Sequence, residues 1–206
     1  MSAPPGGTAR RAAENGSGGH EVEIKLPAPD LDAVRGRLRE GGGRLVAARH
    51  LERNDLYDDA EGSIAKRGCV LRLRRAEGVA LLTFKGSAQF AGGIKAREER
   101  ETAVADPDAL DRILAGLGYQ PRFRYEKRRE EWAFERCVVA LDETPIGRFV
   151  EIEGDPTAIR AVLPQLGLDP AEALPYSYAD LYTRRRREDP TLPADMLLQE
   201  TERSGP

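Results

Sequence analysis

The chain has 206 residues, of which 40% are hydrophobic and 33% are charged, which is enough apolar material for the core of one domain. Its 32 Lys and Arg residues nearly balance its 35 Asp and Glu residues, and the net charge of −3 disfavours a protein that coats nucleic acid. No apolar run approaches the ~20 residues that span a bilayer, and the start lacks the apolar region of a signal peptide. The 2 cysteines and 2 histidines suit neither a disulfide framework nor a zinc site, so we expect a soluble protein of the cytoplasm.

Residues 1–19 are rich in Gly, Ala, Pro and Ser, so we expect a disordered leader before a folded domain over 20–183. The domain begins with a predicted strand over 20–27. A helix follows, which Asp30 caps at its start and the glycines at 41–43 end. The alternation of apolar and polar residues then predicts strands near 45–50, 54–58, 69–75, 79–85 and 94–104.

Two further helices are expected to begin at Asp106 and Asp155, because Asp is a good helix cap and each is followed by Pro. Between them the pattern predicts strands over 122–134, 137–142 and 148–153. A short helical segment over 177–182 ends the domain, and 184–206 are expected to form a polar tail. The arginines at 184–187 suit a phosphate or nucleic-acid patch, but we favour a solvated run of charge. About eight strands and three or four helices predict an α+β fold with a mostly antiparallel sheet.

Apolar and ionised side chains alternate along almost every predicted strand. Glu21, Glu23 and Lys25 share one face of the first strand, and apolar residues share the other. The same pattern places ionised side chains together at Arg72 and Arg74, at Lys85, at Lys95, Arg97, Glu99 and Glu101, at Lys127 and Arg129, at Asp142, and at Glu151 and Glu153. The ordinary interpretation is a sheet with one face in water, but such a face usually mixes Ser, Thr and Gln with charges. We therefore expect the strands to close into a barrel with a charged lumen and helices outside.

A charged lumen needs a ligand, because unpaired buried charge is costly. Arg and Lys side chains offer several hydrogen-bond donors to phosphate oxygens. Clustered carboxylates are the ligands that Mg²⁺ or Mn²⁺ prefers, and such a metal would relieve their mutual repulsion. The strand pattern thus predicts a polyphosphate bound together with Mg²⁺ or Mn²⁺.

The order of these motifs resembles the CYTH domain of the triphosphate tunnel metalloenzyme superfamily. The resemblance covers about residues 20–183 and rests on Glu21-x-Glu23-x-Lys25, Asp55-x-Tyr57-Asp58, Arg72-x-Arg74, Lys85, Arg97-x-Glu99-x-Glu101, Lys127-x-Arg129, Asp142, Glu151-x-Glu153 and the terminal SYADLY. It implies an eight-stranded tunnel that binds a triphosphate and a divalent metal. One departure is Tyr176, where many relatives carry a basic residue.

The resemblance also implies roles for the matched residues. The expected metal ligands are the carboxylates Glu21, Glu23, Asp142, Glu151 and Glu153. The expected phosphate ligands are the basic side chains Lys25, Arg72, Arg74, Lys85, Arg97, Lys127 and Arg129. Glu99 and Glu101 either hold a second metal or orient neighbouring arginines. Lys25 acts either as a phosphate donor, which we favour, or as a general base, and Glu21 and Glu23 complete the expected catalytic set.

The remaining chemistry-bearing side chains have simpler expected roles. Trp132 and Phe134 should cover a helix rather than form a platform on which a base stacks, while Tyr57 and Tyr178 should pack or support the site. By strand parity, Arg124 and Arg128 should face outward. His50 is expected at the surface or at a strand end.

Three functions remain open. The first is metal-dependent hydrolysis of inorganic tripolyphosphate, a nucleoside triphosphate or thiamine triphosphate by a metal-activated water. The second is a class IV adenylate cyclase that converts ATP to cyclic AMP and pyrophosphate. The third is a non-catalytic module that binds polyphosphate or nucleotides, which the carboxylate pairs disfavour. We favour hydrolysis because it requires fewer features of the site than cyclisation does. No membrane partner is expected, and a homodimer is compatible with the sequence.

Overall fold

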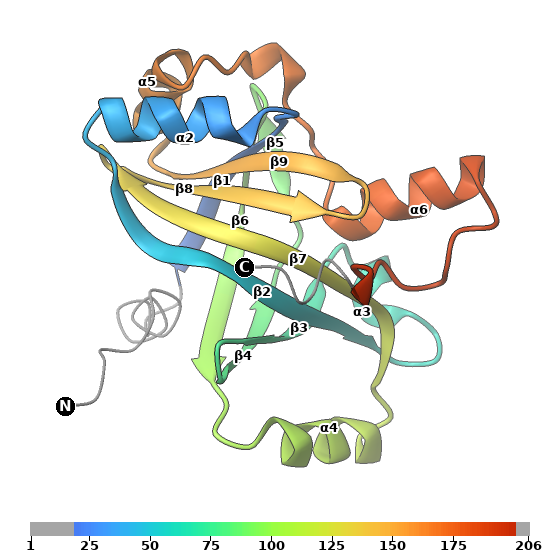
Figure 1. Ribbon diagram of the computed structural model, residues 1–206. Coiled ribbons are helices and arrows are strands. Elements are labelled where there is room, and N and C mark those ends of the chain that lie inside the picture. The colour runs from blue at the N-terminus through green and yellow to red at the C-terminus, as the bar shows by residue number, and fades with distance from the viewer. Residues whose placement is uncertain (1–18, 201–206) are drawn as a thin grey trace.

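The computed structural model describes residues 19–200, and in it one antiparallel sheet curls into a barrel with helices outside (Figure 1). The strands are β1 (Gly19–Pro27), β2 (Arg44–Asp58), β3 (Val70–Ala76), β4 (Val79–Lys85), β5 (Gln89–Ala91), β6 (Ile94–Ala103), β7 (Gln120–Phe134), β8 (Cys137–Thr144) and β9 (Gly147–Gly154). The helices are α2 (Leu31–Glu40), α3 (Ser63–Lys66), α4 (Pro107–Gly116), α5 (Pro156–Gln165) and α6 (Tyr178–Glu188), with a 3₁₀ turn, η1 (Pro170–Glu172). The expected leader lies outside the described residues except for Gly19, which opens β1.

The strand order β1-β9-β8-β7-β2-β3-β4-β6 closes on itself, because β1 pairs with both β9 and β6. The short strand β5 pairs along β6 and adds a ninth strand outside the ring. All these pairings are antiparallel. The predicted α+β fold, an eight-stranded closed barrel with helices packed outside, is confirmed.

The main core lies outside the barrel wall, between the strands and the helices α2 and α5. Leu26 and Ile152 on the outer faces of β1 and β9 pack with Leu38 of α2 and Ile159 of α5, and all are fully buried or nearly so. Trp132 and Phe134 belong to the same cluster, as predicted. Figure 1 shows α2 and α5 together over one side of the barrel, with α4 at the opposite end and α6 on a third side. Burying the apolar faces in this way leaves the ionised faces to line the lumen.

The predicted helix starts are present. The carboxylate of Asp30 accepts a hydrogen bond from the Ala33 N–H at 2.9 Å. Asp106 and Asp155 cap α4 and α5 in the same way, which satisfies amide groups that have no partner within the helix.

Several parts of the chain differ from the expected elements: α3, β5 and η1 were not expected, and the bounds of two predicted elements differ. The strands expected near 45–50 and 54–58 are one continuous strand, β2, whose register against β7 shifts at three places, including one between Ala47 and His50. Such bulges interrupt the alternation of apolar and polar residues without ending the strand. Helix α6 extends past the expected end at residue 182 to Glu188. None of the described helices is long and apolar enough to cross a membrane.

Residues after α6 return to the barrel, although a polar tail was expected from residue 184. The Met196 N–H donates to the Arg124 carbonyl at 2.9 Å, and the Met196 carbonyl accepts from the Glu126 N–H at 2.9 Å. The Met196 side chain is fully buried among Tyr125 and Tyr178. These hydrogen bonds attach the C-terminal segment to the first half of β7, before the residues that pair with β8.

Candidate active site

One cavity of about 740 Å³ runs inside the barrel. Every predicted site residue except Asp142 lines it, so the structure brings together side chains from β1, β3, β4, β6, β7 and β9. The cavity lining also includes Lys95 and Glu131, which were not among the predicted ligands.

Glu21 is held by two cations from neighbouring strands. Lys85 Nζ lies 2.6 Å from Glu21 Oε1, and Arg97 Nε lies 2.7 Å from Glu21 Oε2. Lys85 also donates to Glu99 at 2.9 Å. Burial alone would raise the pKa of Glu21, but Lys85 and Arg97 outweigh that effect and hold the pKa well below its usual value. Glu21 is therefore ionised in the folded protein.

Glu23 and Glu153 are directly opposite each other on β1 and β9. Like charges at such positions repel, and both side chains line the cavity. Lys95 of β6 forms an ion pair with Glu23. An added cation beside this pair of carboxylates would relieve their mutual repulsion.

Lys25 lies where β1 meets the segment that precedes α6. Its Nζ is 3.2 Å from Glu151 Oε1 and donates to the Tyr176 carbonyl at 3.2 Å. The ammonium also lies 3.8 Å from the centre of the Tyr178 ring. Burial would raise the pKa of Glu151, but Lys25, Lys127 and other cations hold it well below its usual value.

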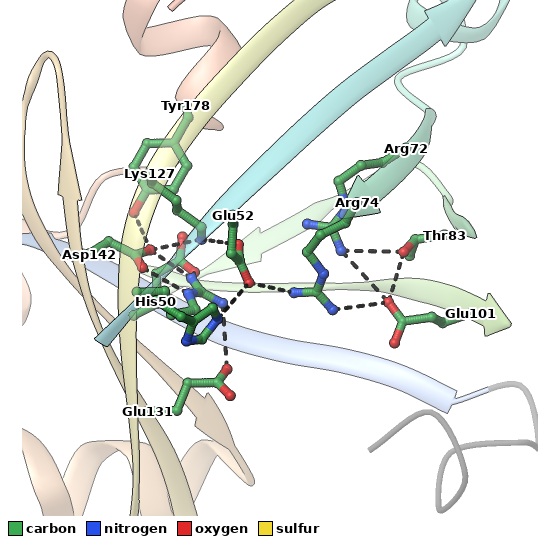
Figure 2. Close-up of polar contacts among 12 residues, drawn as sticks. His50, Glu52, Arg72, Arg74, Thr83, Glu101, Lys127, Glu131, Asp142 and Tyr178 are labelled. Carbon is green, nitrogen blue, oxygen red and sulfur yellow. Dashed lines mark hydrogen bonds and ion pairs between the residues drawn. The ribbon is translucent and has the colours of Figure 1, made fainter. Parts of the chain in front are cut away.

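Asp142 is fully buried and does not line the cavity itself, but it contacts basic side chains that do (Figure 2). Its oxygens accept hydrogen bonds from Arg129 Nε at 2.7 Å and Nη2 at 2.6 Å, from Lys127 Nζ at 3.0 Å and from the Tyr178 hydroxyl at 2.7 Å. Burial lowers the pKa of Arg129, but Asp142 and Glu151 outweigh it and raise that pKa well above its usual value. These contacts fix the direction of two phosphate-ligand candidates, and they occupy the carboxylate that was expected to bind a metal.

Glu52 is a central residue that the sequence analysis missed. It is fully buried, with Oε1 3.1 Å from Arg74 Nη1 and Oε2 3.5 Å from Lys127 Nζ, and Figure 2 shows it between these two cations. Burial would raise the pKa of Glu52, but Lys127 and Arg74 hold it well below the usual value. A continuous strand through residues 51–53 would have placed Glu52 on the lumen face by parity.

Glu101 connects Arg72 and Arg74, the two arginines of β3 that line the cavity. Thr83 Oγ1 donates to Glu101 Oε2 at 2.8 Å and accepts from Arg72 Nη2 at 3.3 Å. Arg74 Nη2 donates to the same carboxylate oxygen at 3.4 Å. Of the two roles expected for Glu101, this arrangement corresponds to the orientation of arginines.

The expectation that His50 lies at the surface or at a strand end is wrong. The residue is 6% exposed within the continuous strand β2, its Nδ1 lies 2.8 Å from the Ala48 carbonyl, and its Nε2 lies 3.8 Å from Glu52 Oε1. Burial lowers the pKa of His50, but the contacts with Glu52 and the Ala48 carbonyl outweigh it and raise that pKa above 6.5. Arg124 is exposed, as expected, while Arg128 faces away from the lumen yet is only 6% exposed, opposite Glu143 in β8.

The carboxylates of the lumen fit a hard divalent cation by their chemistry. Glu23 and Glu153 are opposite each other in the register of β1 and β9, and Glu21 lies two residues from Glu23 on the same face. Oxygen donors alone are the set that Mg²⁺ and Mn²⁺ prefer. Within residues 19–200, no three His, Cys, Asp or Glu side chains converge in an arrangement that could hold a metal ion. Glu21 and Glu23 contact Lys and Arg side chains instead.

The family model of the CYTH domain matches residues 19–164. The chain belongs to the CYTH domain family. The match covers the strands that carry the lumen cations and carboxylates, and it ends before Tyr178.

Solved structures show the same tunnel fold as this CYTH domain. A candidate adenylate cyclase from Vibrio parahaemolyticus is 22% identical, with 81% of this chain and 99% of that chain covered and a TM-score of 0.71. The PH1819 protein from Pyrococcus horikoshii OT3 is 26% identical, with 81% and 99% covered and a TM-score of 0.68. HpAC1 from Hippeastrum, a candidate adenylyl cyclase with a dominant triphosphatase activity, is 21% identical, with 85% and 99% covered and a TM-score of 0.59. No curated protein matches the chain.

Proposed function

We propose that this CYTH domain hydrolyses a triphosphate that it binds in the tunnel together with Mg²⁺ or Mn²⁺. The observation that carries the proposal is that basic side chains from several strands around the barrel line one cavity. These cations are Lys25, Arg72, Arg74, Lys85, Arg97, Lys127 and Arg129. A chain of phosphates is the ligand whose charge and length suit donors distributed along a tunnel.

Several cations are oriented before any ligand arrives. Asp142 directs Arg129 and Lys127, and Glu52 lies between Lys127 and Arg74. Donors that are already in place stabilise charge on a transferred phosphoryl group without reorganising during the reaction. Phosphoryl transfer depends mainly on this kind of positioning.

A bound Mg²⁺ or Mn²⁺ would supply Lewis-acid stabilisation and would lower the pKa of a water nucleophile. Glu23 and Glu153 are the residues we expect to hold it, with Glu21 beside them. Lys25, on the same face of β1, would donate to a phosphate oxygen and release its contact with Glu151.

Adenylate cyclisation is the second candidate. HpAC1, which has the same fold, is a candidate adenylyl cyclase with a dominant triphosphatase activity, so both reactions are considered for this fold. The cavity of about 740 Å³ also has room for more than three phosphates. In a cyclase the ribose 3′-hydroxyl, rather than water, would attack, and pyrophosphate would leave.

Product analysis tests the proposal. The purified protein is incubated with tripolyphosphate, ATP or thiamine triphosphate and Mg²⁺ or Mn²⁺, and the products are separated by chromatography. Release of inorganic phosphate that stops on addition of EDTA supports hydrolysis. Cyclic AMP with an equal amount of pyrophosphate supports the cyclase instead. Binding of triphosphates that persists in EDTA, without turnover of any of them, supports a non-catalytic module.

A further inference from the structure

His50 belongs to a buried row of polar side chains that the cavity does not reach. His50, Glu52 and Asn54 lie at alternate positions of β2, in unbroken register with β7, and therefore share one face of the strand. None of the three is more than 6% exposed, and the next residue of the row, Leu56, is the first that lines the cavity. What His50 does in this row depends on where its protons lie.

The contacts of the His50 ring indicate that both of its nitrogens carry a proton. Nδ1 lies 2.8 Å from the Ala48 carbonyl, and because a carbonyl oxygen only accepts, Nδ1 must be the donor. Nε2 is buried without a hydrogen-bond partner among residues 19–200 and faces Glu52 Oε1 at 3.8 Å (Figure 2). A neutral ring would direct the lone pair of Nε2 at this carboxylate, which is repulsive. An imidazolium instead directs a positive N–H at it.

The charges around the ring also favour the imidazolium. Glu52 is ionised, because Lys127 and Arg74 hold its pKa well below the usual value. Burial lowers the pKa of His50, but Glu52, the Ala48 carbonyl and Glu77 outweigh burial and raise that pKa above 6.5. The charged groups on the neighbouring strands and turn are Arg74 of β3, Glu77 of the β3–β4 turn, and Arg129 and Glu131 of β7.

Arg129 is the cation directly opposite His50 in the register of β2 and β7. Its guanidinium forms ion pairs with Asp142 and Glu151, so its positive charge is already matched. Arg74 is likewise paired with Glu52 and Glu101. The cations near His50 therefore have carboxylate partners of their own, and a proton on His50 adds to the charge that balances Glu52.

We propose that His50 is a positioning residue, an imidazolium that shares Oε1 of Glu52 with Arg74, and that its protonation is coupled to the binding of a polyphosphate in the lumen. Loss of the proton would remove one positive charge behind the lumen and leave Glu52 to attract Arg74 and Lys127 more strongly. Polyphosphate affinity should therefore fall as the pH rises through the pKa of His50. By reciprocity, a bound polyphosphate should raise that pKa. The coupling rests on the proposed phosphate site, whereas the imidazolium does not.

Nitrogen NMR of the imidazole rings tests the protonation state directly. The chain has 2 histidines, so the signals of His50 are those lost in His50→Gln. In the ligand-free protein His50 should titrate above the ordinary pKa of about 6.5, and its neutral form should keep the proton on Nδ1. Tripolyphosphate, added without metal, should raise the pKa by about 0.7 or more, which corresponds to a coupling of about fivefold. A pKa at or below about 6.5, or a neutral form protonated on Nε2, overturns the imidazolium.

Calorimetry with tripolyphosphate, again without metal, tests the coupling. Gln can donate to Glu52 but does not titrate, so His50→Gln keeps a hydrogen bond and loses the pH response. Between about pH 6 and pH 9, the Kd of the wild-type protein should rise by about fivefold more than that of His50→Gln. The matched control is His20→Gln, which replaces the other, exposed histidine and should retain the wild-type response.

Equal pH responses of the wild-type protein and His50→Gln overturn the coupling, as does a response that is lost in His20→Gln instead. A merely structural role of His50 would change Kd by the same factor at both pH values. If the wild-type protein does not bind tripolyphosphate, the coupling and the proposed function both fail, and the ligand-free titration still decides the imidazolium. If it binds but hydrolyses no triphosphate when Mg²⁺ or Mn²⁺ is supplied, the proposed function alone fails.

Discussion

Asp142 illustrates how one buried carboxylate can organise a charged site. It accepts hydrogen bonds from Lys127, Arg129 and Tyr178, and none of these residues is more than 8% exposed. The buried charges of Glu21, Glu52 and Asp142 are tolerable because each carboxylate lies against cationic side chains. Strand parity predicted that Lys127 and Arg129 lie on the lumen face. Only the pairing of β7 with β8 shows that Asp142 orients these two side chains.

Replacing Asp142 by Asn should therefore destabilise the protein. The change leaves Lys127 and Arg129 without their shared counter-ion, and breaking a buried pair in this way costs about 3–5 kcal/mol. Urea unfolding of Asp142→Asn measures the loss. The matched control is Asp108→Asn at an exposed position of α4, which should stay close to wild type. Equal stability of the two variants would show that Asp142 does not anchor the cations.

Glu23 carries the prediction about the metal. In Glu23→Gln, the Mg²⁺ concentration for half-maximal turnover should rise by about tenfold or more, since even the loss of a group that supports a ligand costs 10–100-fold in metal affinity. Glu98→Gln is the control, because Glu98 pairs with Arg100 at the outer surface. An unchanged Mg²⁺ requirement in Glu23→Gln would remove Glu23 from the ligand set.

At the scale of elements, strand and helix positions were predicted well where the pattern is local. Alternation predicted the lumen faces of β1, β3, β4, β6, β7 and β9, and Asp caps predicted the starts of α2, α4 and α5. The continuous strand β2 was not predicted because its bulges break the alternation of apolar and polar residues. For the same reason the positions of His50 and Glu52 in the barrel were not predicted. The return of Met196 to β7 was missed because a single apolar residue in a polar segment gives no periodic signal.

At the scale of elements, Met196 allows a prediction about how much the segment after α6 stabilises the barrel. Met196→Ala should lower the free energy of unfolding by about 2–5 kcal/mol, the usual effect of truncating a fully buried Met. Thermal or urea unfolding measures it. The neighbouring Leu197, which is 42% exposed, provides the control Leu197→Ala, whose stability should change little. Similar effects of both variants would mean that the segment after α6 does not stabilise the barrel.

At the scale of the whole molecule, closure of the sheet into a barrel determines which lumen side chains become neighbours. The pairing of β1 with both β9 and β6 brings Glu21, Glu23 and Lys25 beside partners more than 70 residues away in the chain, such as Arg97 and Glu151. A strand pattern alone indicates which faces are charged, but it does not give the order of strands around a barrel. The ion pairs that neutralise the ligand-free lumen therefore needed the structure.

The same network predicts how stability depends on pH. The pKa values of Glu21, Glu52 and Glu151 are held well below 4.5 in the folded protein. A lowered folded-state pKa stabilises the fold above the ordinary value, and the contribution is lost as the pH falls through the lowered one. The free energy of unfolding should thus decrease steadily between about pH 5 and 3, as measured by urea unfolding across that range. A constant free energy of unfolding across this range would contradict the matched-charge description of the lumen.

The most direct test of the central claim is a crystal structure of the protein with tripolyphosphate and Mn²⁺. The tunnel account predicts phosphate oxygens within hydrogen-bonding distance of Arg72, Lys127 and Arg129, and an anomalous Mn²⁺ signal beside Glu23 and Glu153. Tripolyphosphate bound instead at the arginines 184–187 of α6, with none in the barrel, would contradict it.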